Sequence, residues 1–144
     1  ADIEYVLNGS RLKALYLSCH GGVTESGVGF ITDAGELRYA HWLVRADQID
    51  SNYKFVFLDA CLSSSNGTFP DGFLGNNQSG KCFVGWNVSI SATTAYYFNT
   101  QFLPLVGERT ILDAVLIARE NSLMQGYSDC NPGFYGDASC YGLA

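Results

Sequence analysis

A histidine and a cysteine stand at the ends of two short apolar segments of this chain. One segment leads from Leu15 to His20, and the other leads from Phe55 to Cys61. A thiol attacks a carbonyl group only as the thiolate, so it needs a base nearby, and histidine serves because its pKa lies near neutrality. The pair therefore predicts thiol-based covalent catalysis. The alternative is that Cys61 is a small buried hydrophobic residue, as a single cysteine at a strand end usually is.

Three further residues would surround this pair. Asp59 stands two positions before Cys61, so both side chains would project to the same side of a strand. A carboxylate there would attract a cationic substrate side chain; alternatively, it accepts hydrogen bonds from the backbone of a neighbouring turn. Trp86 and Asn87 end the next apolar segment, where they would wall a substrate cleft, although an aromatic residue there is as often part of the core.

Short apolar segments would position these residues. Residues 12–18, 54–58 and 82–86 are apolar and bounded by polar residues, which is typical of strands buried on both faces of a parallel sheet. Chemistry gathers at the carboxyl ends of such strands. Residues 28–32 and 37–44 flank a short loop that contains Gly35 and predict a β-hairpin inserted between the first two core strands.

Two helices are predicted after the third strand. Ser89 or Ser91 would cap the first helix, which would end before Gly107. Thr110 and Asp113 resemble a capping box that opens the second helix. The predicted apolar stripes are Ala92, Ala95, Tyr96, Phe102 and Leu103 on the first helix, and Ile111, Leu112, Val115, Leu116 and Leu123 on the second. Residues 62–80 predict a long polar loop, and residues 130–144 predict at most one further strand.

Composition limits the classes of function. The chain has 144 residues, of which 47% are hydrophobic and 15% are charged, so one domain with a substantial core is predicted. A net charge of −6 without a basic cluster argues against nucleic acid as a partner. No segment approaches the roughly 18–20 consecutive apolar residues that cross a bilayer, so no membrane partner is predicted either.

The five cysteines are an odd number, so at least one of them lacks an intramolecular partner. No pair has the CxxC spacing of a zinc site. If the protein is exported, Cys130 and Cys140 are the predicted disulfide pair, because they would close a short loop in a segment with little regular structure.

The segments that end at His20-Gly21 and at Asp59-Ala60-Cys61 resemble the catalytic segments of the caspase-like cysteine peptidases. That clan includes clostripain, gingipains, legumain, separase, metacaspases and the CHAT domains. Its pattern is an apolar strand ending in His-Gly, then an apolar strand ending in an acidic residue or Gln, Ala or Ser, and Cys. The third predicted strand, the two helices and the turn at 135–138 are similar in order to later parts of the family, so the resemblance covers residues 12–140.

The resemblance implies a three-layer α/β caspase-like fold with a mostly parallel sheet, and a cysteine endopeptidase that uses no cofactor or metal. Cys61 would be the nucleophile and His20 would protonate the leaving amine. The backbone N–H groups of Gly21 and Cys61 would face the oxyanion, and Gly21 suits this role because it has no side chain. The partner would be a protein or peptide, cut after Arg or Lys, since an acidic residue at the place of Asp59 accompanies that preference in metacaspases and clostripain.

Two departures from the family keep an alternative open. The family has a strand–helix–strand unit ahead of the histidine strand, but only about a dozen residues precede that strand here, too few for a crossover. Either the sheet is reduced, with one edge or face incompletely covered, or the domain contacts other parts of a longer chain. Leu62 also follows the cysteine where caspases have a polar residue and then Gly. A non-catalytic recognition or scaffold domain is therefore the second hypothesis. A flavodoxin-like binding domain is the third, although no Gly-rich phosphate loop follows the first strand.

Overall fold

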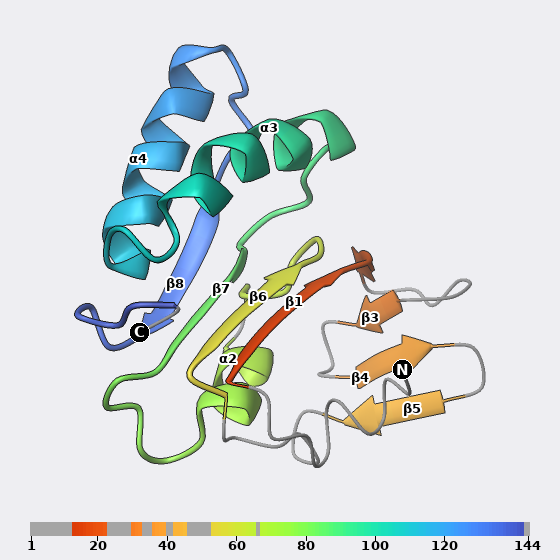
Figure 1. Ribbon diagram of the computed structural model, residues 1–144. Helices are drawn as coiled ribbons and strands as arrows, with labels where there is room; N and C mark the ends of the chain where they lie inside the picture. The colour runs from red at the N-terminus through yellow and green to blue at the C-terminus, as the bar shows by residue number, and fades with distance from the viewer. Residues whose placement is uncertain are drawn as a thin grey trace.

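The protein, seen in a computed structural model, is an α/β structure with two four-stranded sheets (Figure 1). The structure describes residues 13–22, 30–32, 36–39, 42–45, 53–65 and 67–142. In the first sheet, β1 (Ala14–Ser18), β6 (Phe55–Asp59) and β7 (Cys82–Trp86) are parallel neighbours, and β8 (Pro132–Gly136) pairs antiparallel with β7. The predicted α/β class and mostly parallel sheet are confirmed.

The three strands of this sheet that the sequence predicted differ in burial. Every residue of β6 and β7 is buried, as expected for strands covered on both faces. Strand β1 alternates between half-buried and exposed residues, and its outer edge has no partner strand in the part of the chain that the structure describes. This strand is therefore the edge of the sheet as far as it is described.

The second sheet follows β1 directly and has the order β2-β3-β4-β5. Its strands are β2 (His20–Gly22), β3 (Phe30–Thr32), β4 (Glu36–Tyr39) and β5 (Trp42–Arg45). The predicted hairpin is present, because β3 and β4 pair antiparallel. The prediction of one strand over 37–44 was wrong: β4 and β5 are separate strands that pair with each other, with Tyr39 opposite Trp42. The run lacks Gly and Pro, so it gives no sequence signal for that break. His41 lies outside the described residues.

Helices cover both faces of the first sheet. Because successive strand residues point to opposite faces, Phe55 and Phe57 pack towards α3 (Ala92–Phe102) and α4 (Ile111–Met124), which lie together in Figure 1. Val56 and Leu58 pack on the other face with α2 (Thr68–Leu74). The short 3₁₀ helix η2 (Leu103–Leu105) connects α3 towards α4. The core thus consists of two apolar layers, one on each face of the sheet.

Helix α2 lies within the stretch that the sequence predicted to be a polar loop. It buries Phe69, Phe73 and Leu74 against the sheet. Pro70 is the third residue of the helix, where a missing N–H group costs nothing because the first turn has no intrahelical acceptor to bond. The prediction failed because these apolar residues are few and the Ser, Asn and Gly residues around them dominate the composition.

The helix caps were predicted better than the helix faces. Ser91 accepts a hydrogen bond from Thr94 N–H, and Thr110 accepts one from Asp113 N–H, as capping predicts. The predicted stripes were only partly right: Phe102, Ile111 and Val115 are buried, whereas Tyr96 is 73% exposed and Leu116 is 51% exposed. The buried residues are Thr94, Phe98 and Phe102 on α3, and Ile111, Ala114, Val115, Ala118 and Ser122 on α4. Large aromatic rings already fill this layer, so the room left for α4 suits small side chains.

Candidate functional site

Strands β1 and β6 bring His20 and Cys61 to the same edge of the sheet. The two strands pair in parallel with Ser18 opposite Asp59, and Cys19 N–H continues the pairing by donating to the Asp59 carbonyl oxygen at 3.2 Å. His20 follows Ser18 by two positions, and Cys61 follows Asp59 by two positions. The backbone positions of the predicted dyad therefore lie just beyond the carboxyl ends of neighbouring parallel strands (Figure 1). His20 also begins β2, so the chain passes from one sheet to the other at this point.

The Cys61 thiol is half-buried and makes two hydrogen bonds to one residue. Its Sγ donates to the Ile90 carbonyl oxygen at 3.4 Å and accepts from Ile90 N–H at 3.2 Å. Ile90 belongs to the segment that leads from β7 into α3, so the thiol connects the turn after β6 to that segment. The N–H contact would stabilise a thiolate, whereas the carbonyl contact suits a neutral thiol.

The backbone N–H of Cys61 has no hydrogen-bond acceptor among the described residues. In the turn after β6, Ala60 N–H donates to the Leu58 carbonyl oxygen, Leu62 N–H to that of Val88 and Ser63 N–H to that of Ala60. Among the described residues, no acceptor bonds the N–H of Cys61 itself. This is the group that the sequence predicted as an oxyanion donor. The other predicted donor, Gly21, lies in β2, where it is opposite Ile31 of β3.

Leu62, directly after Cys61, has a left-handed backbone conformation with a φ of 62°. A β-carbon disfavours this region, so a leucine there stores strain that the surrounding contacts must offset. It is the one described non-glycine residue with a positive φ. The departure from the family pattern at this position thus coincides with backbone strain beside the candidate nucleophile.

Two serines hold this turn in place, and the sequence did not single them out. Ser63 Oγ donates to the Leu58 carbonyl oxygen at 2.8 Å and accepts from Trp86 N–H at 3.0 Å. Ser64 Oγ donates to Asn87 Oδ1 at 2.8 Å. Both serines are buried, so the turn that carries Cys61 is fixed against the carboxyl end of β7. Their only sequence signal was their place two and three positions after the cysteine.

Asp59 is buried under α3, with an exposed fraction of 6%. Its Oδ1 accepts from Trp86 Nε1 at 2.7 Å, and its Oδ2 accepts from Tyr16 OH and Asn99 Nδ2, both at 3.0 Å. Neither arrangement predicted for this carboxylate is observed: it is not exposed to a substrate side chain, and its three described donors are side chains and not backbone N–H groups. Asp59 projects to the same face as Phe57, and that face is covered by α3.

Two groups lie beside this carboxylate, the Tyr16 hydroxyl and the Asn99 amide. Burial, and then the negative charge of Asp59, raise the pKa of the Tyr16 hydroxyl. Asn99 Oδ1 is buried and has no hydrogen-bond donor among the described residues. One acceptor next to the carboxylate is thus left without a donor.

Trp86 and Asn87 have structural partners at this end of β7. Trp86 is 0% exposed, and its ring packs against Phe98 with the centroids 4.9 Å apart, so it does not line an open surface as the cleft prediction required. Asn87 is half-buried; besides accepting from Ser64, its Nδ2 donates to Asn131 Oδ1 at 3.4 Å. Trp86 instead positions Asp59, and Asn87 helps to position the turn that carries Cys61.

The predicted disulfide between Cys130 and Cys140 does not fit the fold. Cys130 lies near the carboxyl end of β7, where the Asn131 carbonyl oxygen accepts from Asn87 N–H. Cys140 lies near the amino end of β7, close to Cys82. Strand β8 separates the two cysteines by about 13 Å at about 3.3 Å per residue, beyond the roughly 7 Å that a disulfide spans between Cα atoms.

Three further observations concern metal ligands, membrane-spanning helices and the thiol of Cys19. No three His, Cys, Asp or Glu side chains gather closely enough to hold a metal ion in the described part of the chain. No described helix is both long enough and apolar enough to span a bilayer. Burial and the charge of Asp59 raise the pKa of Cys19 to about 12, so this neighbouring thiol stays protonated at neutral pH.

Comparison with known proteins adds no assignment. No protein-family model matches the chain, and no curated protein matches it significantly.

Proposed function

We propose that this chain is a caspase-like cysteine endopeptidase domain in which Cys61 is the nucleophile and His20 is the proton carrier. The observation that carries the proposal is the register of β1 and β6. Ser18 pairs with Asp59, so His20 and Cys61 each lie two positions beyond this pair, at the carboxyl ends of the two strands. This is where parallel sheets collect reactive groups. The interpretation as this family comes from the resemblance of the two strand-end motifs.

The chemistry would proceed in two stages. The Cys61 thiolate adds to the scissile carbonyl carbon, and the oxyanion accepts hydrogen bonds from the N–H groups of Cys61 and Gly21. The amine leaves with a proton from His20, and a thioester remains on Cys61. Water then hydrolyses the thioester after giving a proton to His20. The unbonded N–H of Cys61 supports the oxyanion role.

We also propose cleavage after Arg or Lys. Because Asp59 is buried, it would attract the basic substrate side chain through its charge and not by direct contact in an open pocket. The described donors to Asp59 are all neutral groups, so its negative charge is not balanced by them. A cationic substrate group that approaches from the side of Tyr16, which is 47% exposed and donates to Asp59, would lie near this charge. The buried charge would then favour basic over acidic side chains before the cut.

One observation favours the second candidate, a non-catalytic recognition or scaffold domain. The Cys61 thiol both donates to and accepts from Ile90, which satisfies it as a neutral group. A nucleophile must leave the Ile90 carbonyl when it ionises. The two candidates thus differ in the reactivity of this thiol.

The test is the rate at which a peptidyl chloromethyl ketone ending in Arg or Lys alkylates each cysteine, measured by peptide mass spectrometry. We expect rapid labelling of Cys61 that falls at least about 100-fold in His20→Ala, since general acid–base groups contribute this much. His41→Ala is the matched control, because it removes the other histidine of the chain, and it should keep the wild-type rate. Slow labelling of Cys61 that is equal in both variants would favour the scaffold domain. Faster labelling by reagents ending in Asp would refute the specificity alone.

A further inference from the structure

Cys82 and Cys140 lie close together at the amino end of β7. This end of the sheet is opposite to the end where Cys61 lies. Cys82 begins β7, and its N–H donates to the Lys54 carbonyl oxygen at 2.9 Å. The Cys140 thiol contacts the same carbonyl oxygen at 3.6 Å and the Gly80 carbonyl oxygen at 3.3 Å. Cys82 N–H and the Cys140 thiol thus meet at one carbonyl oxygen, that of Lys54. Both residues are buried in the core layer under α4.

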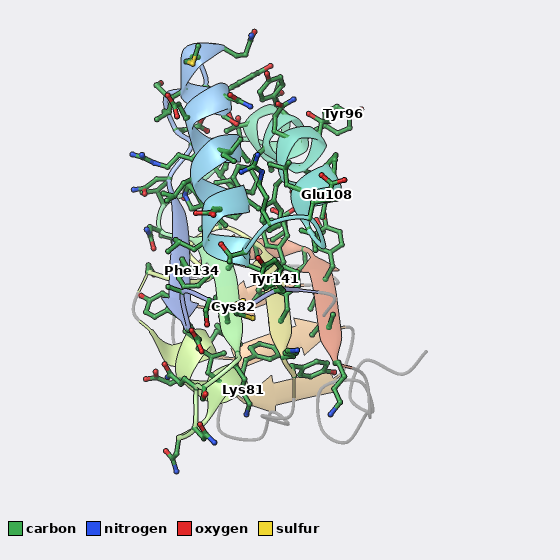
Figure 2. The ribbon with its side chains drawn as sticks, turned by 60° about the vertical axis from the view of Figure 1, so that its left-hand side comes forward. Lys81, Cys82, Tyr96, Glu108, Phe134 and Tyr141 are labelled. Carbon is green, nitrogen blue, oxygen red and sulfur yellow. The ribbon has the colours of Figure 1, made fainter. Side chains whose placement is uncertain are left out.

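The backbone on both sides of Cys140 is held firmly in this place. Asp137 N–H donates to the Lys81 carbonyl oxygen, and Asp137 Oδ2 accepts from Gly80 N–H, both at 2.8 Å. Cys140 N–H donates to the Asp137 carbonyl oxygen at 3.0 Å, and its carbonyl oxygen accepts from Ile111 N–H at 2.9 Å. Figure 2 shows Tyr141, the next residue in the chain, close to Cys82. The place of Cys140 beside the start of β7 therefore follows from these backbone hydrogen bonds.

Cys82 and Cys140 lie far from the other three cysteines in the fold. Cys19 and Cys61 follow the carboxyl ends of β1 and β6, whereas Cys82 starts the parallel strand β7 at the opposite edge. Cys130 lies beyond the far end of β8, as described above. Among the five cysteines, which are all thiols in this structure, Cys140 is thus the natural partner of Cys82.

We propose that Cys82 and Cys140 form a disulfide under oxidising conditions, and that this bond ties the segment after β8 to the start of β7. The oxidant would be a low-molecular-weight disulfide such as oxidised glutathione. The Cys140 thiolate attacks one of its sulfurs and releases one glutathione thiolate. The Cys82 thiolate then attacks the Cys140 sulfur of the mixed disulfide and releases the second. The two protein protons end on the two glutathione molecules, and the protein loses two electrons.

The order of attack follows from the surroundings of the two sulfurs. Burial raises the pKa of both thiols. The positive charge of Lys54 acts to lower the pKa of the Cys140 thiol, so we expect Cys140 to attack first. Because both groups are buried, exchange in the folded protein requires local opening and should be slow.

The experiment refolds the reduced protein from urea in a glutathione redox buffer, so that burial does not limit access, then alkylates free thiols and digests with trypsin. Cleavage after Lys81, Arg109 and Arg119 puts Cys82 in the peptide 82–109 and both Cys130 and Cys140 in the peptide 120–144. We expect these two peptides to be joined by a disulfide while Cys130 carries the alkyl group, as fragmentation of the joined peptides will show. A link through Cys130, or alkylated Cys82 in the refolded protein, would overturn the proposal.

A second measurement tests whether the disulfide stabilises the folded protein. The disulfide closes a long loop, so the oxidised protein should melt about 10 °C above the reduced protein. Cys140→Ala should abolish this difference, and the matched control Cys130→Ala should keep it. Equal melting temperatures of the oxidised and reduced proteins would contradict a bond that fits the native geometry.

Discussion

The buried carboxylate of Asp59 should be a major source of stability, and Asp59→Ala measures it. The substitution leaves Trp86 Nε1–H without an acceptor in a fully buried place, which costs about 2 kcal/mol. Tyr16 OH and Asn99 Nδ2 lose their bonds at partly buried positions, at about 1 kcal/mol each. We therefore expect the free energy of unfolding to fall by about 4 kcal/mol, a large part of the roughly 5–15 kcal/mol of a typical domain.

Asp59→Asn is the matched control, because it keeps the size and shape of the side chain. Its amide oxygen can still accept from Trp86 Nε1–H. If the Asn99 amide turns over, its buried Oδ1, which has no donor now, can accept from the new amide group. We expect this variant to lose about 1 kcal/mol.

Urea unfolding followed by far-ultraviolet circular dichroism measures both variants, with the slope checked for constancy. A loss below about 1 kcal/mol in Asp59→Ala would show that the three hydrogen bonds do not hold this carboxylate as described. Equal losses in the two variants would show that the effect is one of charge and not of hydrogen-bond pairing.

Two further predictions concern the backbone after Cys61 and the turn after β8. At Leu62, with its φ of 62°, Leu62→Gly should be about 1 kcal/mol more stable to urea than Leu62→Ala, reversing the usual order; equal stabilities would mean that the turn is unstrained. Hydrogen bonds from Gly80 N–H and then Ser139 lower the pKa of Asp137 from 3.8 to about 2. Its folded pKa lies below the unfolded one, so its contribution is present above pH 3.8 and is lost as the pH falls through about 2. Melting temperatures of the wild type and Asp137→Asn should therefore converge over that interval, and a constant difference would refute this.

Local patterns predicted the elements that carry the site. The apolar segments before His20 and Cys61 became β1 and β6, because short apolar runs bounded by polar residues are typical of strands, although only β6 is buried throughout. Ser91 and Thr110 were recognisable as caps, because capping depends on residues only three positions apart. These features are local, so the sequence alone could indicate them.

The helix faces and α2 could not be predicted in the same way. The exposed Leu116 and the buried Ser122 show that hydrophobicity does not select the face of α4. That choice depends on the aromatic rings that β6, β7 and α3 place in the same layer, a property of packing and not of one segment. Similarly, Phe69 and Phe73 form a helical face only because the sheet offers an apolar surface to cover.

Residue types and local order were enough to identify the residues that could do chemistry and the two strands that end beside them. Long-range packing makes β1 and β6 parallel neighbours in a register that pairs Ser18 with Asp59, two positions before His20 and Cys61. It also places Asp59 under α3 and brings Cys140 and Cys82 to the same carbonyl oxygen. The reason is physical: strand-end motifs depend on local order, whereas the partners of a buried polar group depend on segments far apart in the chain that packing brings together.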